Sequence, residues 1–256
     1  MQKILLSLAV FFISTVCCFA QNDTIRILAI GNSFSDDAIE DHLYPLAKAE
    51  GLTIVIGNIY KGGCSIERHV RNLRGDITDY EYRKIDAEGE RTISYGYTMA
   101  RGLADEDWDF VSFQQSSPNS GFAQTYDQLP ELVEYVKARV PEDAVFMFHQ
   151  TWAYSKDSKH KEYHRYDNDQ MKMYNAIVAA VNEVVPKIEE IEIVIPSGTA
   201  IQNARTSVLG DDLTRDGYHL SKPYGRYVAS CTWLQAVLGK NPVGNAYCPE
   251  GMTEKE

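Results

Sequence analysis

Residues 24–35 read TIRILAIGNSFS, an apolar run that ends in a Gly-Asn-Ser turn. The run is short, rich in β-branched residues and almost continuously apolar, which is typical of a strand in a parallel sheet covered on both faces. The acidic segment DDAIED follows at residues 36–41 and opens a helical pattern. The stretch therefore predicts the first strand–turn–helix unit of an α/β domain, with Ser33 in the turn.

Four more apolar runs are spaced along the chain, and helical patterns separate them. The runs cover residues 52–60, 109–115, 144–152 and 191–197. The helical patterns cover residues 37–50, 65–74, 96–106, 127–139, 168–185 and 222–238. This alternation predicts a three-layer αβα sandwich around a five-stranded parallel sheet. No repeat, low-complexity segment or linker divides the chain, so residues 21–256 are expected to form a single domain.

Two polar segments interrupt the alternation. Residues 75–95 have the composition of an insertion, with a hairpin about the sequence AEGE, and residues 153–166 form a charged, Tyr-rich loop after the fourth apolar run. Ligands of doubly wound sheets bind at the carboxyl ends of the strands. We expect both segments to rise from that edge or from its rim.

The first 20 residues, MQKILLSLAVFFISTVCCFA, have the pattern of a cleaved secretory signal peptide. Their apolar stretch is shorter than the roughly 20 residues that a membrane-spanning helix needs. We therefore expect a secreted or periplasmic protein with no stable membrane insertion after cleavage. The segment holds one Lys and no acid, so its removal changes the formal charge from −11 to −12. This charge argues against nucleic acid as a partner, because phosphate binding needs clustered Lys and Arg.

Three cysteines follow the predicted cleavage site: Cys64, Cys231 and Cys248. In an oxidising compartment they allow at most one intramolecular disulfide, and the sequence does not decide which pair would form it. Cys231 lies in the apolar pattern of the last helix, which favours packing in the core. Cys64 follows a Gly-Gly pair, and no base stands near it in the sequence.

Two short motifs carry the signal for chemistry. Ser33 lies where the first strand gives way to a helix, whose free N–H groups favour an oxyanion, although Ser33 or Ser35 would equally serve as a helix cap. Asp216 and His219 stand three residues apart just before the last helical pattern. On a helical turn the carboxylate would orient the imidazole as a general base for a serine, and a structural ion pair is the alternative.

The segments GNSFS and DGYHLS, on this α/β pattern, resemble the SGNH (GDSL-like) hydrolases, and within them an uncharacterised secreted branch of the acetylhydrolase type. The resemblance spans about residues 24–240 and implies a flavodoxin-like fold. It also implies that Ser33 is the nucleophile, His219 the general base and Asp216 the acid that orients it.

The resemblance further implies an oxyanion hole made by the Ser33 N–H, a glycine N–H and an asparagine side chain. The glycine corresponds to Gly63, or second to Gly62, in YKGGCSIE; a simple turn would explain both residues too. The family's Gly-x-Asn-Asp segment is missing after the third strand, where the chain reads FVSFQQSSPNSG. We expect another amide to donate instead: Gln115 first, with Gln114 and Asn119 as alternatives.

The loop after the fourth apolar run offers further candidates. We expect Gln114, His149, Trp152 and Tyr154 to contact substrate, because aromatic faces beside amides suit sugar rings, although Trp152 would also fit the core. His160 and His164 stand four residues apart, a spacing that suits zinc, but their order is not that of a His-Glu-x-x-His motif.

The sequence thus predicts a secreted serine esterase that removes O-acetyl groups from a carbohydrate through an acyl-enzyme, with neither metal nor cofactor. A carbohydrate methylesterase or a lipid or thioester hydrolase would use the same triad. A metal-dependent hydrolase built on His160 and His164, or a non-catalytic carbohydrate-binding domain, are the alternatives from other classes.

Overall fold

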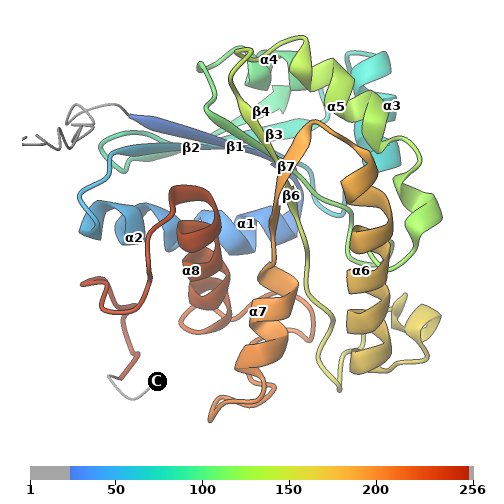
Figure 1. Cartoon of the computed structure of the whole chain (residues 1–256), viewed down its shortest axis with the longest axis vertical. Helices are drawn as coiled ribbons and strands as arrows, with labels where there is room; N and C mark the ends of the chain where they lie inside the picture. Colours follow the sequence, from blue (N-terminus) through green and yellow to red (C-terminus); the bar gives the residue numbers. More distant parts are fainter. Residues whose placement is uncertain (1–23, 254–256) are drawn as a thin grey trace, which may run out of the picture.

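The computed structural model describes residues 24–253, so the predicted signal peptide lies outside the described residues. The described chain forms a seven-stranded sheet with helices on both faces (Figure 1). The strand order is β4-β3-β2-β1-β5-β6-β7. The predicted α/β class and its three layers are confirmed, but the sheet holds seven strands rather than five.

The five strands expected from the sequence are present and run parallel to one another. They are β1 (Ile25–Gly31), β2 (Ile54–Tyr60), β5 (Phe110–Phe113), β6 (Val145–His149) and β7 (Ile191–Ile195). Their order is that of a flavodoxin-like sheet, in which the chain first steps from β1 to β2 and then crosses back to β5. The reversal lies between β1 and β5, where the loops diverge and doubly wound folds place their ligands.

The two additional strands form the hairpin expected within residues 75–95. β3 (Tyr80–Ile85) pairs antiparallel with both β2 and β4 (Arg91–Tyr97). The turn is closed by the Asp86 carboxylate, which accepts hydrogen bonds from the N–H groups of Glu88 (3.1 Å) and Glu90 (2.8 Å). The hairpin therefore extends the edge of the sheet instead of standing apart from it.

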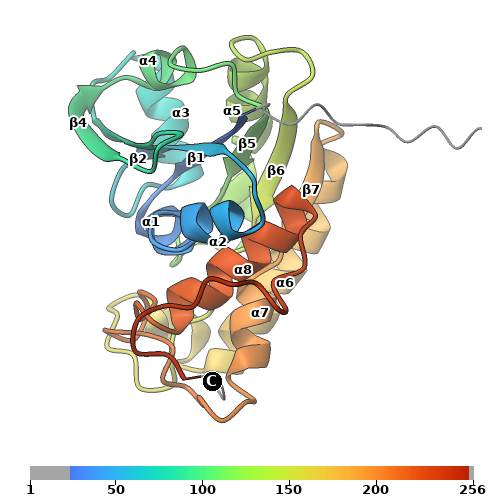
Figure 2. The same ribbon diagram turned by 90° about the vertical axis from the view of Figure 1, so that its left-hand side faces the viewer.

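The helices form two layers, which Figure 2 shows on opposite faces of the sheet. One layer contains α1 (Ser33–Ile39), α2 (Leu43–Ala49) and α8 (Gly225–Leu238), with α7 (Ser197–Ala204) packed against α8. The other contains α3 (Ile66–Arg74), α4 (Met99–Leu103), α5 (Leu129–Lys137) and α6 (Gln170–Val184). Short 3-10 turns complete the chain: η1 (Ala123–Tyr126), η2 (Tyr163–Tyr166) and η3 (Val185–Lys187).

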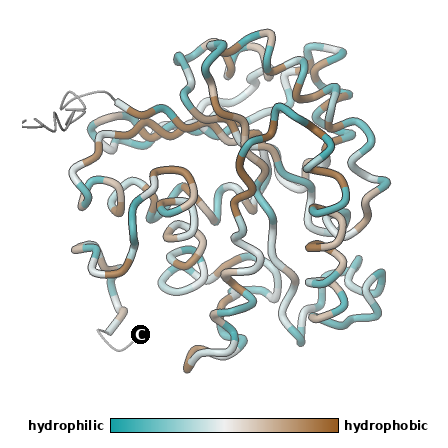
Figure 3. Tube along the Cα trace, viewed as in Figure 1, coloured by the Kyte–Doolittle hydropathy of each residue, from teal (hydrophilic) through white to brown (hydrophobic). Residues whose placement is uncertain are grey.

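The apolar strands lie at the centre of the molecule, whereas hydrophilic loops cover the outside (Figure 3). The middle of β1, from Ile27 to Ile30, is at most 1% exposed. Burial of these side chains is the main source of stability for this layer arrangement. None of the helices within residues 24–253 is long and apolar enough to cross a membrane.

The single helix predicted over residues 37–50 is two helices, and the first begins at Ser33. Asn32 caps α1 and so starts it earlier than the hydrophobic pattern suggested. Pro45 lacks a backbone N–H and suits only the first turn of a helix, which is where it lies in α2. These two residues set the boundaries that periodicity missed.

Candidate active site

Three side chains from opposite ends of the chain form an unbroken line of hydrogen bonds. The Ser33 hydroxyl lies 2.8 Å from Nε2 of His219, and Nδ1 of His219 lies 2.6 Å from a carboxylate oxygen of Asp216. Ser33 is the first residue of α1, directly after β1, and the other two precede α8. The structure therefore brings together the three residues that the two sequence motifs predicted.

Hydrogen bonds to its carboxylate fix Asp216 in place. Besides the His219 ring, it accepts the backbone N–H groups of His219 (2.8 Å) and Tyr218 (3.1 Å). Burial raises the pKa of this carboxyl, but these hydrogen bonds outweigh that effect, so the pKa lies below its usual value. An ionised Asp216 holds the proton of His219 on Nδ1, which leaves Nε2 free to accept the proton of Ser33.

The predicted helix cap is a different residue. Asn32, not Ser35, caps α1, because its side-chain oxygen accepts the Phe34 N–H at 3.0 Å. Ser35 is fully buried, and its hydroxyl donates to the Asn32 carbonyl at 2.7 Å. The capping role leaves Ser33 free, half-buried at the surface of the turn. An Asn immediately before the first helical residue is an N-cap signal that the sequence contained.

A tight turn after β2 lies beside Gly31 and Asn32, at the start of α1. The Cys64 N–H donates to the Lys61 carbonyl at 3.0 Å, and Gly63 within this turn has a φ of +63°. That left-handed conformation favours glycine, and the space where a Cβ would stand is open. In the described part of the chain, no group accepts a hydrogen bond from the N–H of Ser33 or of Gly63. Both N–H groups are thus available to a ligand.

Asn32 holds this turn against the start of α1. Its side-chain nitrogen donates to the Cys64 carbonyl at 2.9 Å, and the Lys61 N–H donates to the Gly31 carbonyl at 3.2 Å. The Asn32 oxygen also accepts the side-chain nitrogen of Gln114, which follows β5, at 2.8 Å. One buried amide therefore joins the loops after β1, β2 and β5, a role that spacing alone did not reveal.

The expected role of Gln115 in the oxyanion hole requires correction. Its side-chain nitrogen donates to the carbonyl (2.8 Å) and hydroxyl (3.2 Å) oxygens of Thr125, and its oxygen accepts the N–H groups of Ile66 and Ser116. The side chain is 1% exposed. Gln115 thus joins the start of α3 to η1 and has no N–H left for an oxyanion. In Asn119, the other alternative, the side-chain oxygen accepts a hydrogen bond from Arg165 at 2.9 Å.

The four predicted substrate contacts also require correction, because all of them are buried. Gln114 is 2% exposed, and His149, Trp152 and Tyr154 are 0% exposed. Nδ1 of His149 bonds Gln114 at 3.0 Å, and burial lowers the pKa of this histidine to about 3, so the ring is neutral and supports Gln114. Trp152 stacks on Phe34 of α1 with ring centroids 4.2 Å apart. These side chains form the floor beneath the site rather than its surface.

Asp37, which no sequence motif singles out, ties the helix of Ser33 to the loop of His219. It is fully buried in α1. Its carboxylate accepts the Leu220 N–H at 2.7 Å and pairs with Arg215 at 2.9 Å, so it holds both sides of the Asp216–His219 segment. Arg226 of α8, 6% exposed, adds a third contact at 2.5 Å. The hydrophobic pattern hid this acid because it lies on the apolar face of a helix.

The two histidines considered as zinc ligands do not belong to a ligand cluster. Nδ1 of His160 accepts the Glu162 N–H at 3.2 Å, and Nδ1 of exposed His164 bonds the Lys161 carbonyl at 2.7 Å. Among residues 24–253, no three His, Cys, Asp or Glu side chains are grouped so as to hold a metal ion. Each histidine instead stabilises its own loop.

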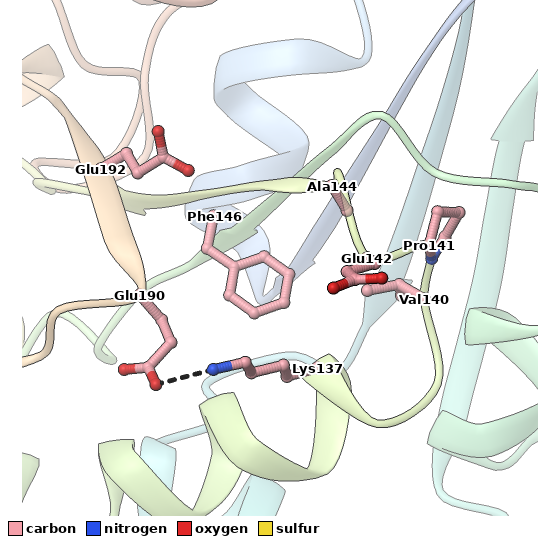
Figure 4. Close-up of a pocket in the computed structure, with 8 residues that line it drawn as sticks. All are labelled: Lys137, Val140, Pro141, Glu142, Ala144, Phe146, Glu190 and Glu192. Atoms are coloured by element: carbon pink, nitrogen blue, oxygen red, sulfur yellow. Dashed lines mark hydrogen bonds and ion pairs between the residues drawn. The ribbon is translucent and has the colours of Figure 1, made fainter.

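A cavity of about 390 Å³ lies at the amino ends of β6 and β7. Ser33 follows the carboxyl end of β1, so the cavity is at the opposite end of the strands. Figure 4 shows the ion pair between Lys137 and Glu190, 3.0 Å apart, beside the ring of Phe146. Glu142 and Glu192 also line it, and no hydroxyl or thiol nucleophile does. The cavity therefore has no part in the chemistry of the serine.

The three cysteines differ in how deeply they are buried, and this difference predicts that they react with alkylating reagents at different rates. All three are unpaired; Cys64 is buried, and Cys248 is exposed. Burial raises the pKa of Cys64 to about 12 and that of Cys231 to about 11, so at pH 8 their thiolates are scarce. We expect iodoacetamide at pH 8 to alkylate Cys248 first and the other two only after unfolding in urea, as followed by peptide mass spectrometry. Rapid alkylation of Cys64 in the folded protein would contradict this placement.

The doubly wound sheet, the serine after its first strand and the Asp-x-x-His segment before its last helix define an SGNH (GDSL-like) fold. Solved structures share it. A putative GDSL-like lipase from Parabacteroides merdae has a TM-score of 0.56 and 14% identity over 84% of this chain and 96% of its own. An acetylxylan esterase from Geobacillus stearothermophilus has a TM-score of 0.51 and 11% identity over 88% and 96%.

Within that fold, the chain belongs to the family described as Domain of unknown function (DUF4886), whose profile matches residues 26–256. The crystal structure of a family member from Bacteroides uniformis has a TM-score of 0.88 and 51% identity, over 91% of this chain and 90% of its own. A search of curated proteins gave no match.

Proposed function

We propose that this protein is an exported serine esterase that removes O-acetyl groups from a carbohydrate. The observation that carries the proposal is the continuous line of hydrogen bonds from the Ser33 hydroxyl through His219 to Asp216, with contacts of 2.8 and 2.6 Å. A histidine that contacts a serine hydroxyl and is oriented by a carboxylate activates that hydroxyl for acyl transfer. The pattern of the first 20 residues supports export.

In the first half of the reaction, the Ser33 oxygen attacks the ester carbonyl while Nε2 of His219 takes the hydroxyl proton. The Asp216 carboxylate stabilises the imidazolium that forms. The N–H groups of Ser33 and Gly63 bind the oxyanion of the tetrahedral intermediate. The imidazolium then gives its proton to the sugar oxygen as the ester bond breaks, and Ser33 keeps the acetyl group.

In the second half, water attacks the acetyl-enzyme. His219 takes a proton from that water, and the N–H groups of Ser33 and Gly63 again bind the oxyanion. When the second intermediate collapses, the proton returns to the Ser33 oxygen and acetate leaves. Of the three donors that the family pattern led us to expect, the two backbone N–H groups remain, because the side-chain nitrogen of Gln115 donates to Thr125 instead.

Two further points support an acetyl ester as substrate. Two structures of the same fold, both of variants of one Geobacillus enzyme, are described as an acetylxylan esterase and as an acetyl-xylooligosaccharide esterase, at 11% and 12% identity. An acetyl group is also the smallest common acyl group, and the triad lies at a partly exposed surface, with the His219 side chain 19% exposed. A methyl-esterified uronate is the second candidate, because the triad chemistry is the same.

The proposal is tested by measuring acetate and methanol released from acetylated and methyl-esterified polysaccharides, with the Ser33→Ala protein as the blank. We expect acetate release above the blank from at least one acetylated glycan. Methanol release alone would make the protein a methylesterase. Release of neither product, from polysaccharides or from small activated esters, would show that it is not an esterase.

A chelator separates this mechanism from a metal-dependent one. Since the triad needs no metal, we expect activity in excess EDTA to equal that in buffer. A hydrolase that used His160 and His164 would lose activity to EDTA and would keep it in the Ser33→Ala variant. His160→Ala and His164→Ala proteins, assayed with and without zinc on 4-nitrophenyl acetate, which has no sugar to bind, provide the matching control.

A further inference from the structure

Two half-buried rings continue the active site beyond His219. The Tyr218 ring centroid lies 4.2 Å from that of His219, and the His160 ring lies 4.8 Å from Tyr218 at an interplanar angle of 76°. Unlike Trp152 and Tyr154, which are 0% exposed, Tyr218 and His160 keep part of their surface in solvent. They are therefore aromatic side chains beside the triad that a ligand can reach.

The loop that carries His160 is fastened to the segment that carries Tyr218. The Ser155 N–H donates to the Gly217 carbonyl and the Trp152 indole N–H to the Tyr218 carbonyl, both at 2.8 Å. Gly217 has a φ of +91°, and a Cβ there would lie 2.8 Å from Cα of Ser158. Figure 2 shows these yellow and orange segments side by side. The two rings are thus held in place before any ligand arrives.

A buried layer supports the rings from behind. The Tyr154 ring lies 4.7 Å from that of His160 and 5.7 Å from that of Tyr218. The Tyr154 hydroxyl is itself fixed by the Ser117 hydroxyl at 2.9 Å. Since little rotamer freedom is left to lose, binding to this surface costs little conformational entropy.

The hydrogen bonds of His160 determine its tautomer. Because Nδ1 accepts the Glu162 N–H at 3.2 Å, the neutral ring carries its proton on Nε2. Burial is the main reason why the pKa of His160 lies below its usual value, which favours the neutral ring. No group within residues 24–253 accepts a hydrogen bond from this Nε2. The ring therefore offers one N–H donor to a ligand.

We propose that Tyr218 and His160 form the sugar-binding platform of this site: Tyr218 stacks on a pyranose ring of an O-acetylated oligosaccharide, and Nε2–H of His160 donates to an oxygen of that sugar. A sugar presents both an apolar C–H face and hydroxyl acceptors, which is what an aromatic ring beside a neutral N–H donor recognises. The inference rests on the proposed function, because it places the sugar that carries the ester beside the nucleophile.

The test compares kcat/KM for an acetylated xylo-oligosaccharide with kcat/KM for 4-nitrophenyl acetate, which has no sugar to bind. We expect Tyr218→Ala and His160→Ala each to lower the ratio of the two values about tenfold, through KM of the oligosaccharide. Tyr218→Phe should restore the ratio, since stacking needs only the ring. His164→Ala, in the same loop, is the matched control and should leave the ratio unchanged. An equal loss on both substrates would overturn the platform.

Binding without turnover separates this inference from the esterase itself. In the Ser33→Ala background, calorimetry with the same oligosaccharide should show binding that Tyr218→Ala weakens about tenfold. If the wild type cleaves no ester but this loss of binding is observed, the platform stands and the esterase proposal fails. If the Ser33→Ala protein does not bind the oligosaccharide, or binds it equally well with Tyr218→Ala, the platform is wrong.

Discussion

A Ser33→Ala variant is expected to lose at least about 10³-fold in kcat/KM for the acetyl ester that the wild type cleaves best. The hydroxyl oxygen of Ser33 is the atom that would become acylated. It becomes a nucleophile when Nε2 of His219, 2.8 Å away, accepts its proton. The substitution removes one oxygen from a half-buried side chain, so the fold should survive. Steady-state kinetics and a thermal melt of the same sample measure both effects.

The double variant Ser33→Ala with His219→Ala provides the sharper control. Residues that act as one unit give non-additive losses. We therefore expect His219→Ala to be nearly as inactive as Ser33→Ala, and the double variant to be no worse than either. Independent roles would multiply the two losses. Multiplied losses, or a kcat/KM of the Ser33→Ala protein within tenfold of the wild-type value, would show that the hydrogen bonds among Ser33, His219 and Asp216 have a structural role and not a catalytic one.

Asp37→Ala is expected to lower the free energy of unfolding by about 1–3 kcal/mol. The reason is that Arg226, which is 6% exposed, loses its closest carboxylate, 2.5 Å away, and keeps only Asp41 at 2.9 Å and Asp36 at 3.5 Å. The Leu220 N–H also loses its acceptor. Because Asp37 joins the helix of Ser33 to the loop of His219, kcat should fall as well under conditions in which the variant is folded. Urea unfolding and steady-state kinetics measure the two losses.

Glu131→Ala is the matched control for that prediction. Glu131 also pairs with an arginine, Arg74, but the side chains are 42% and 59% exposed. Because solvent and salt screen an exposed pair, it contributes little to stability, and we expect both the free energy of unfolding and the activity to be nearly unchanged. If Asp37→Ala cost no more than Glu131→Ala, the buried carboxylate would not be what holds the two halves of the site together.

The sequence was most informative where the pattern was local. The apolar runs marked the five parallel strands, and the polar segment about AEGE marked a hairpin, because strand and turn preferences are properties of neighbouring residues. Helix boundaries were less accurate. Asn32 moved the start of α1 by capping it with a side-chain hydrogen bond, and Pro45, which lacks a backbone N–H, confined α2 to a separate helix. Hydrophobic periodicity does not contain either kind of information.

Expectations about individual polar side chains were the least reliable. Gln115, His149 and Trp152 lie at or just after the carboxyl ends of strands at the ligand edge, and their chemistry suited a substrate. The structure buries all three. Residues at the end of a strand alternate between faces, and only the packing of the loops above them decides which ones reach solvent.

By itself, the sequence determined the α/β class, the five parallel strands, and Ser33, Asp216 and His219 as the candidate catalytic residues. Only the tertiary structure decided how they meet. Ser33 and His219 are 186 residues apart in the chain, and their contact depends on β1 and α8 being placed together and on the buried Asp37 that fastens α1 to the loop of His219. Such contacts depend on three-dimensional packing and burial, which sequence patterns do not encode locally.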